Sequence, residues 1–238
     1  MVKLGVISDI HSDVVALETM LKVFERDGCD RIVCLGDIIS IGPFPQQTVE
    51  RVRAIPDVIA VSGNHDRCLA ERKPASPNMG KDEILHHRWM YEVMTKDAVD
   101  YLGSLPYRVD MTVENVRITA LHFAMDEKQE YLDFSEATVA ERSRLFGNID
   151  ADVILYGHEH QRSILRDGKK LYVNFGPLGC PGRSKNIARG GILFVEDGRA
   201  EAIPLELKYP AELSVQEIDR LKYPWGDDVK LCFYGIRE

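Results

Sequence analysis

The stretch "VIAVSGNHDR", residues 58–67, joins an apolar run to a turn that carries an amide, an imidazole and a carboxylate in succession. The apolar part has the β-branched composition of a buried strand. A turn needs only the flexibility of Gly63, so the three polar side chains that follow it are more than the turn requires. The stretch therefore predicts a strand whose end presents functional groups.

The chain before this stretch repeats a strand and helix rhythm. Residues 2–8 predict a buried strand, residues 12–27 a helix closed by Gly28, residues 31–35 a second strand and residues 45–54 a second helix. Repeats of this kind place parallel strands in one sheet with helices on its faces. We therefore expect an α/β fold.

The rhythm changes after about residue 70. The Pro, Ser, Asn and Gly residues of positions 72–83 predict a loop, and residues 82–104 predict two amphipathic helices. We interpret residues 70–105, approximately, as an inserted helical cap in which Trp89 packs inward while His86, His87 and Arg88 face water. The alternative is that these four residues contact a nucleobase or phosphate.

Three antiparallel hairpins are predicted in the remaining chain, at residues 107–122, 162–175 and 190–205. A helix at residues 135–147 and a strand at residues 152–156 separate the first two. The whole of residues 1–238 then forms one domain with two β-rich halves covered by helices. Beyond residue 207 only a helix at residues 213–221 is predicted, without an interpretable motif.

Polar clusters follow five of the predicted strands: "DIH", "GD", "GNHD", a single histidine and "GHEH". Ligands of open α/β sheets bind at the carboxyl ends of strands, so the five clusters are expected to converge on one site. They contain oxygen and imidazole groups of the kind that divalent metals bind, namely Asp9, His11, Asp37, Asn64, His122, His158 and His160.

The number and spacing of these groups predict more than one ion. In "DIH" and "HEH" the outer residues are two apart, and in an extended segment such residues point to the same face. Seven ligands exceed the needs of one tetrahedral ion, whereas two ions that share a bridging carboxylate would use them all. Paired catalytic metals typically lie about 3.5–4 Å apart.

Composition narrows the function classes. A net charge of −8 gives no general attraction to phosphate backbones, so long nucleic acids are unexpected as partners. Five scattered cysteines without a CxxC pair fit a reducing compartment, and the first residues read as a strand and not as a leader. No apolar run approaches the roughly 18 residues of a membrane helix. We expect a cytoplasmic protein, with no prediction of its oligomeric state.

The ordered motifs resemble those of the calcineurin-like metallophosphoesterases, whose pattern is DxH, GD, GNH[DE], H and GHxH. The resemblance spans residues 4 to about 195 and implies a four-layer α/β/β/α sandwich of two mixed sheets with a dinuclear metal centre. It implies one metal held by Asp9, His11 and His160, a second held by Asn64, His122 and His158, and a bridge from Asp37. The resemblance implies manganese as the most expected metal, with iron or zinc(II) as alternatives.

The resemblance also implies a mechanism. Two divalent cations lower the pKa of a water between them, so that a metal-bridging hydroxide can attack phosphorus. His65 is expected to protonate the departing oxygen, and Asp66 to hold the His65 imidazole in orientation.

A finer resemblance concerns "GDIISIGPFPQQTVERV", residues 36–52, which is similar to small bacterial members described as phosphodiesterases or diadenosine tetraphosphate hydrolase-like proteins. The chain departs from that pattern at Ile41 and Phe44. Arg183 and Arg189, near a glycine-rich loop, are candidates for binding substrate phosphates.

The sequence is compatible with three functions. The first is hydrolysis of phosphodiesters or dinucleoside polyphosphates, and the second is phosphomonoesterase activity on a nucleotide or sugar phosphate. Both take a small phosphorylated substrate and use the same metals. The third is a non-catalytic scaffold, which the complete set of ligand residues disfavours.

Overall fold

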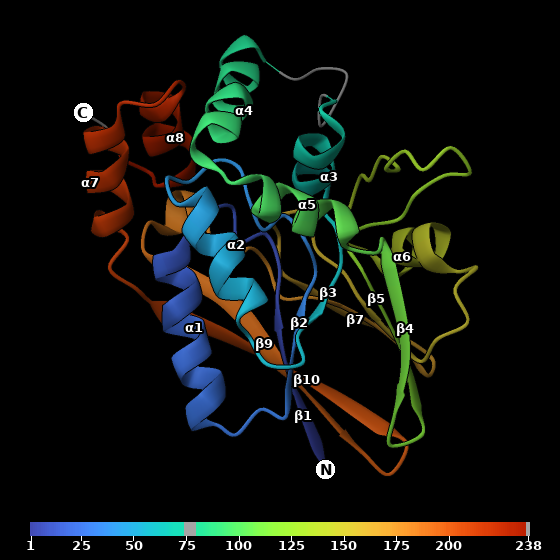
Figure 1. Ribbon diagram of the computed structural model, residues 1–238. Helices are drawn as coiled ribbons and strands as arrows, with labels where there is room; N and C mark the ends of the chain where they lie inside the picture. Colours follow the sequence, from blue (N-terminus) through green and yellow to red (C-terminus); the bar gives the residue numbers. More distant parts are fainter. Residues whose placement is uncertain (74–79, 237–238) are drawn as a thin grey trace.

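Two mixed five-stranded sheets form the centre of the computed structural model, which describes residues 1–73 and 80–236 (Figure 1). The strands of the first sheet are, in spatial order, β10 (Arg199–Lys208), β9 (Ile187–Glu196), β1 (Val2–Ile7), β2 (Arg31–Cys34) and β3 (Ile59–Ala60). The pairs β1–β2 and β2–β3 are parallel, whereas β9 is antiparallel to both β1 and β10.

The second sheet repeats this mixture of directions. Its strands are, in spatial order, β4 (Arg108–Val113), β5 (Val116–Leu121), β6 (Val153–Leu155), β8 (Lys170–Asn174) and β7 (Ser163–Asp167). The three central strands are parallel, and each edge strand belongs to a hairpin. The predicted hairpins are confirmed, but the second half is less purely antiparallel than the sequence suggested.

The helices lie outside the two sheets and around their carboxyl ends (Figure 1). They are α1 (Val14–Arg26), α2 (Pro45–Arg53), α3 (Asn64–Glu71), α4 (Lys81–Val93), α5 (Lys96–Ser104), α6 (Val139–Phe146), the 3-10 turn η1 (Gly182–Ser184), α7 (Glu212–Leu221) and α8 (Gly226–Phe233).

Alternation along β1 explains the layers. Leu4 and Val6 are buried against apolar residues of the second sheet, such as Ile118 of β5. Gly5 faces the other way, where a Cβ atom would lie 2.7 Å from the Phe24 ring of α1. Each strand of this kind is covered on both faces, as its continuous apolar sequence predicts.

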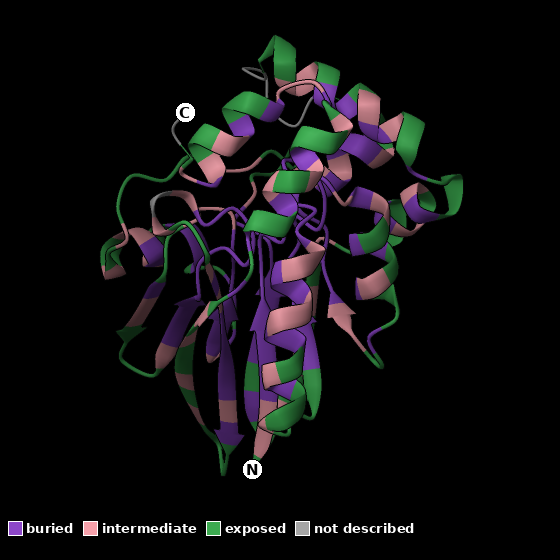
Figure 2. Ribbon diagram, turned by 90° about the vertical axis from the view of Figure 1, so that its left-hand side faces the viewer, coloured by how far each residue is buried: buried purple, intermediate pink, exposed green. Residues whose placement is uncertain are grey.

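The second sheet has its own helical cover. Phe146 of α6 packs with Ile154 and Tyr172 on the face that points away from the first sheet. In Figure 2 the central strands are largely buried, while the edge strands β4 and β10 and the outer sides of the helices are exposed or partly exposed. The order is therefore helix, sheet, sheet, helix, and the predicted four-layer α/β/β/α sandwich is confirmed.

Some element boundaries differ from the predicted ones. The strand predicted for residues 58–62 is reduced to Ile59–Ala60, since the amide of Ser62 already donates to the carbonyl of Pro106 outside the sheet. The helix predicted from residue 135 begins only at Val139, where the Thr138 side chain caps it. Helix α8 was not predicted.

The helices α4 and α5 occupy the region predicted as a cap, and residues 74–79 of the predicted loop lie outside the described residues. The division into one domain with a cap stays a prediction. Among the helices of residues 1–73 and 80–236, none has the length and apolar character that crossing a bilayer demands.

Candidate metal centre

Each predicted metal ligand follows the carboxyl end of a strand, and all seven meet where the two sheets end. The ligands follow β1 (Asp9, His11), β2 (Asp37), β3 (Asn64), β5 (His122) and β6 (His158, His160). The convergence expected from the parallel strands is thus present in the fold.

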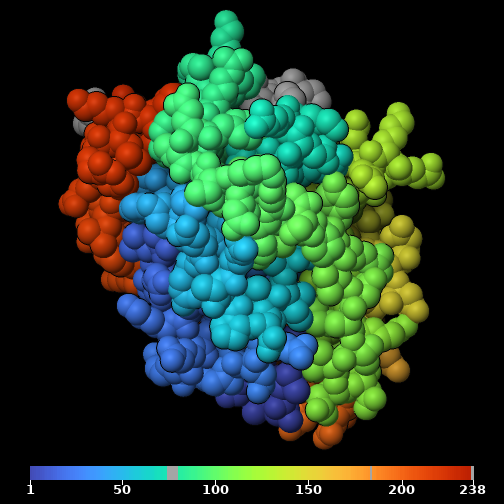
Figure 3. Space-filling view, in the orientation of Figure 1, coloured from blue at the N-terminus to red at the C-terminus, as the bar shows by residue number. Residues whose placement is uncertain are grey.

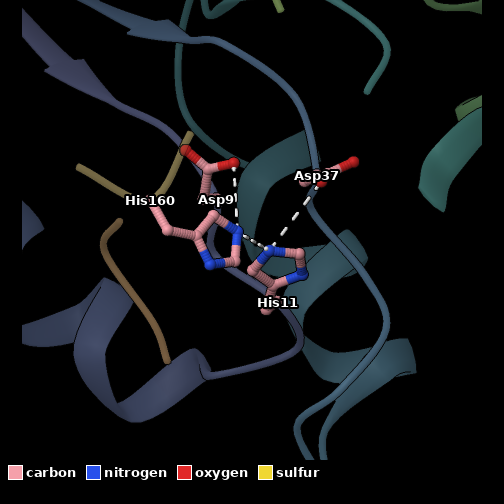
Figure 4. Close-up of side chains that lie close together, drawn as sticks. All are labelled: Asp9, His11, Asp37 and His160. Atoms are coloured by element: carbon pink, nitrogen blue, oxygen red, sulfur yellow. Dashed lines mark hydrogen bonds and ion pairs between the residues drawn. The ribbon is translucent and has the colours of Figure 1, made fainter. Parts of the chain in front are cut away.

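A first group of donor atoms belongs to Asp9, His11, Asp37 and His160, and these atoms all lie within 4.8 Å of one another. In Figure 4, His160 and Asp9 approach His11 from one side and Asp37 from the other. The Nε2 atoms of His11 and His160 are 2.8 Å apart, and His160 Nε2 lies 3.6 Å from Asp9 Oδ1. Two facing imidazole nitrogens need a shared proton or cation between them, so this donor set fits a metal ion.

A second group consists of Asp37, His122 and His158. The Asn64 side chain adds its oxygen, Oδ1, at 3.1 Å from His122 Nε2 and 3.0 Å from His158 Nδ1. The predicted partners of the second ion are therefore in contact. Oxygen and imidazole donors of this kind are suited to manganese, iron or zinc.

Asp37 belongs to both groups through a single atom. Its Oδ2 lies 3.8 Å from His11 Nε2 and 3.3 Å from His122 Nε2. Its other oxygen, Oδ1, accepts a hydrogen bond of 3.0 Å from the backbone N–H of His65. This division fixes the carboxylate while it leaves Oδ2 between the two groups.

Backbone carbonyls orient two of the imidazoles. The Nδ1 atom of His122 lies 2.7 Å from the carbonyl oxygen of Leu35, and that of His11 lies 3.3 Å from the carbonyl oxygen of Ile39. An imidazole that donates from Nδ1 presents the lone pair of Nε2 to a metal. The protein thus sets the tautomer that binding of a cation requires.

The ligand loops have an unusual backbone. Five ligands adopt positive φ angles: Asp9 (53°), His11 (50°), Asp37 (51°), His158 (73°) and His160 (51°). Residues other than glycine rarely adopt this left-handed backbone conformation, because their Cβ atom crowds the backbone. Backbone strain of this kind is concentrated at functional sites. The predicted extended conformation of "DIH" and "HEH" is therefore wrong. Turns bring these side chains together, and the pair in "HEH" is divided between the two groups.

Glycines allow the loops to approach one another. A Cβ atom on Gly63 would lie 2.1 Å from Asp37 Oδ1, and one on Gly157 would lie 1.8 Å from Ser8 Oγ. Any larger residue at either position would displace a loop that carries metal ligands.

Burial and neighbouring charges set the protonation of the ligands. Burial raises the pKa of the Asp37 carboxyl, but the imidazoles of His122 and His65 outweigh it and hold the pKa well below its usual range. Burial lowers the pKa of His122, but the Asp37 carboxylate outweighs it and raises the pKa to about 9. Burial lowers the pKa of His158 to about 3, so that ring is neutral. A cation that binds His122 must therefore displace a proton.

Asp66 has different partners from those predicted. Its carboxylate accepts hydrogen bonds from the backbone amides of Ile38 (2.9 Å), Ile39 (3.2 Å) and Gly63 (2.9 Å). Burial and the nearby Asp37 carboxylate raise the pKa of Asp66 to about 6. These contacts join the "GD" loop to the "GNHD" turn and do not include the imidazole of His65, so the role predicted for Asp66 is corrected to a structural one.

The His65 ring lies beside the first donor group and contacts helix α4. Its centroid is 5.4 Å from that of His11. Its Nδ1 atom faces His87 Nε2 at 3.4 Å and Glu83 Oε1 at 4.0 Å. The sequence predicted neither contact with His65: His87 was expected in water or against a substrate, and no motif spacing connects Glu83 or His87 to the "GNHD" turn.

Two arginines were predicted to bind phosphate, and the structure describes the side chain of only one of them, Arg189. Arg183 belongs to η1, and its side chain is outside the described atoms. Arg189 of β9 donates to Glu206 Oε1 at 3.1 Å and to Ser184 Oγ at 2.6 Å. The Glu206 carboxylate is shared with Arg162, at 3.2 Å, so Arg189 is held by contacts within the protein. These contacts do not support a role in substrate binding.

Two further residues support the second donor group without being predicted to do so. Arg142 of α6 forms a fully buried ion pair of 2.6 Å with Glu159, the central residue of "HEH". The ring of Tyr131 stacks on that of His158, with 5.2 Å between centroids and an angle of 15°. Both contacts restrict the loop that carries His158 and His160.

Comparisons with known proteins agree with this geometry. The model of the calcineurin-like phosphoesterase superfamily domain matches residues 2–197. The phosphodiesterase YfcE of Escherichia coli (strain K12) is 37% identical over 199 residues, which cover 81% of this chain and 88% of that protein.

Two solved structures share the fold. A metallophosphoesterase from Sphaerobacter thermophilus has a TM-score of 0.78 at 22% identity and covers 99% of both chains. A protein proposed to be a diadenosine tetraphosphatase has a TM-score of 0.56 at 18% identity and covers 85% of this chain and 93% of its own. The chain belongs to the calcineurin-like phosphoesterase superfamily and is a phosphoric ester hydrolase of the metallophosphoesterase type.

Proposed function

We propose that this protein hydrolyses phosphodiesters or dinucleoside polyphosphates with the help of two divalent cations. Manganese is the metal that we expect at both positions. The observation that carries the proposal is the position of Asp37 Oδ2 between two groups of imidazole and carboxylate donors. One cation would be held by Asp9, His11, His160 and Asp37, and the other by Asn64, His122, His158 and Asp37. When bound, such a pair acidifies a water that serves as the nucleophile and neutralises phosphoryl oxygens.

The protein's own residues supply the remaining chemistry. Asp37 is fixed by the amide of His65, so the imidazole of His65 is held next to the same centre. We assign His65 as the general acid that donates a proton to the departing oxygen. An alkoxide is a poor leaving group, and a positioned acid contributes roughly 10²–10⁴ in rate.

The names of the relatives support the diester preference. YfcE is described as a phosphodiesterase, and one structural neighbour as a proposed diadenosine tetraphosphatase.

The test compares His65→Ala with the unmodified protein, both loaded with manganese. Substrates are an aryl and an alkyl phosphodiester of the same phosphoryl group, and the aryl monoester. We expect the unmodified protein to prefer the diester. His65→Ala should lose roughly 10²–10⁴-fold in kcat on the alkyl diester and far less on the aryl diester, because a phenolate needs little protonation.

Metal content is the control, since His65 is not among the proposed ligands and its removal should leave that content unchanged. Equal losses on the aryl and alkyl diesters would show that His65 is not the acid. Faster turnover of the monoester would favour the phosphomonoesterase alternative.

A further inference from the structure

The imidazole of His65 is contacted by a helix that lies outside the metal-binding motifs. Helix α4 contributes Glu83 and His87, four residues apart and so on one face of the helix. Their donor atoms lie within 4.8 Å of His65 Nδ1 and of one another. In Figure 3 the segment that contains α4 covers the upper end of the molecule, beside the residues of α3.

All of these contacts use the same nitrogen of His65. His87 Nε2 lies 3.4 Å from Nδ1, and Glu83 Oε1 lies 4.0 Å from it. A carboxylate beside Nδ1 stabilises the tautomer that carries its proton there. Nε2 is then the nitrogen left to face a substrate. It donates its proton from the imidazolium, which carries protons on both nitrogens, and the neutral ring that remains keeps the proton on Nδ1 beside Glu83.

His87 is itself held firmly. Its side chain is buried, with Nε2 at 3.2 Å from Ser40 Oγ and Nδ1 at 3.0 Å from Cys68 Sγ. Burial lowers the pKa of His87 to about 3, so the ring is neutral and offers one donor and one acceptor nitrogen. A ring fixed from both sides is a rigid partner for His65.

The geometry points to Glu83 and His87 as positioning residues, which hold the His65 imidazole with Nδ1 toward α4 and Nε2 toward the departing oxygen. This inference rests on the proposed acid role of His65 and deepens it. It also gives α4 a function in the reaction, because the His65 imidazole is oriented correctly only while α4 is in contact with the "GNHD" turn.

The experiment uses Glu83→Gln, which removes the charge and keeps the shape, and His87→Leu, which removes the ring nitrogens. Each should lower kcat on the alkyl diester by about 10- to 100-fold, the usual effect of residues that orient a functional group, with KM and the aryl diester much less affected. His87→Gln should restore most of the rate, because its amide oxygen can reach the place of Nε2. Asp82→Asn, an exposed acid on the same turn, is the matched control and should have no effect.

Double variants distinguish positioning from a general structural effect. In a His65→Ala background, Glu83→Gln and His87→Leu should cause no further loss on the alkyl diester, since there is no imidazole left to orient. Equal aryl and alkyl losses in the α4 variants, or losses that add to that of His65→Ala, would overturn the inference even if His65→Ala alone shows the leaving-group effect. If His65→Ala shows no such effect, the acid role fails instead.

A readout without turnover keeps the two proposals apart. In the metal-free protein, nitrogen-15 NMR of the His65 ring, assigned by comparison with His65→Ala, should show the proton on Nδ1, and this preference should weaken in Glu83→Gln and His87→Leu. An unchanged tautomer would contradict positioning. A third equivalent of cation bound by the unmodified protein and lost in Glu83→Gln would also contradict it, because the cluster would then be a metal site.

Discussion

Asp37 connects the two donor groups at the scale of single residues. Its Oδ1 is occupied by the amide of His65, and its Oδ2 faces His11 and His122 at once. A neutral side chain of the same shape could keep the amide contact but could not bridge two cations. Asp37 is therefore the residue at which the dinuclear arrangement is most directly tested.

Asp37→Asn is expected to bind fewer than the two equivalents of manganese that we propose for the unmodified protein, because an amide nitrogen replaces the shared carboxylate oxygen. Metal content after equilibrium dialysis measures this. In the metal-free protein the pKa of His122 should also fall from about 9, since the Asp37 carboxylate is what raises it.

NMR titration of the His122 ring gives that second measurement. Asp97→Asn removes an exposed carboxylate and serves as the control. Two full equivalents of tightly bound manganese in Asp37→Asn would exclude Asp37 as the bridge.

The convergence of the seven candidate ligands could be predicted because their order and their places after strands are local properties of the chain. The partners of His65 could not be predicted, since Glu83 and His87 belong to another helix, α4, whose place beside the "GNHD" turn depends on the whole fold. The role of Asp66 was mispredicted for a related reason. Its amide partners at residues 38 and 39 come from another loop.

At the scale of elements, aromatic rings of α4 contact Tyr223, which lies between α7 and α8. The ring of His86 lies 4.8 Å from that of Tyr223 and 5.3 Å from that of Trp89. Trp89 packs against the core as predicted, whereas His86 and His87, expected to face water, are buried. Neither ring nitrogen of His86 has a hydrogen-bond partner among the described residues. Burial lowers the pKa of His86 to about 3.

The low pKa of His86 predicts that the free energy of unfolding falls in acid. The unfolded value is near 6.5 and the folded value is lower, so the stabilising effect of a neutral His86 is complete above about pH 6.5 and is lost as the pH falls toward 3. His86→Phe keeps a ring and removes the titration. The drop in unfolding free energy between pH 7 and pH 5, measured with urea, should be smaller in this variant by about 2 kcal/mol.

Arg88→Gln replaces an exposed residue of the same helix and is the control. It should leave the pH dependence of the unfolding free energy as it is in the unmodified protein. An equal drop in His86→Phe and the unmodified protein would contradict the assignment of this sensitivity to His86.

Elements with strong periodicity were predicted well, and short ones were not. The apolar repeat of α1 fixes its buried face, and its start at Val14 follows from the cap by Asp13. Helix α8 has no such signal, because it begins after Trp225 in a left-handed conformation and only Gly226 and Val229 are buried within it. Its place is set by packing on α7 and η1 and not by its own sequence.

At the scale of the whole molecule, the C-terminal segment holds the loop that carries the first metal ligands. Asp13 accepts hydrogen bonds from Tyr209 (2.8 Å), Ser214 (3.0 Å) and Tyr234 (3.0 Å). The Tyr223 hydroxyl donates to the carbonyl of Ile41 at 2.7 Å. Residues around 200 positions apart in the chain are thereby joined, and no local pattern could predict it.

We expect these contacts to let residues 209–234 shape the candidate metal centre. Asp13 caps α1 through the amide of Ala16 and is only two residues from His11. Movement of its carboxylate would therefore be transmitted to a ligand. In Figure 1 the C-terminal helices α7 and α8 lie beside α1 and near the carboxyl ends of the strands.

Tyr234→Phe removes one of the three hydroxyl groups that hold Asp13 and leaves a buried carboxylate less satisfied. We expect the free energy of unfolding to fall by about 1.5–3 kcal/mol, the range for hydrogen bonds to charged groups, and manganese affinity to fall with it. Tyr172→Phe is the matched control, because that buried hydroxyl lies 3.4 Å from Ser143 Oγ, which belongs to α6 and not to a loop with candidate metal ligands. Urea unfolding and manganese titration measure both effects. The coupling would be refuted if Tyr234→Phe were destabilised while its manganese affinity stayed equal to that of Tyr172→Phe, since the C-terminal segment would then stabilise the fold without shaping the site.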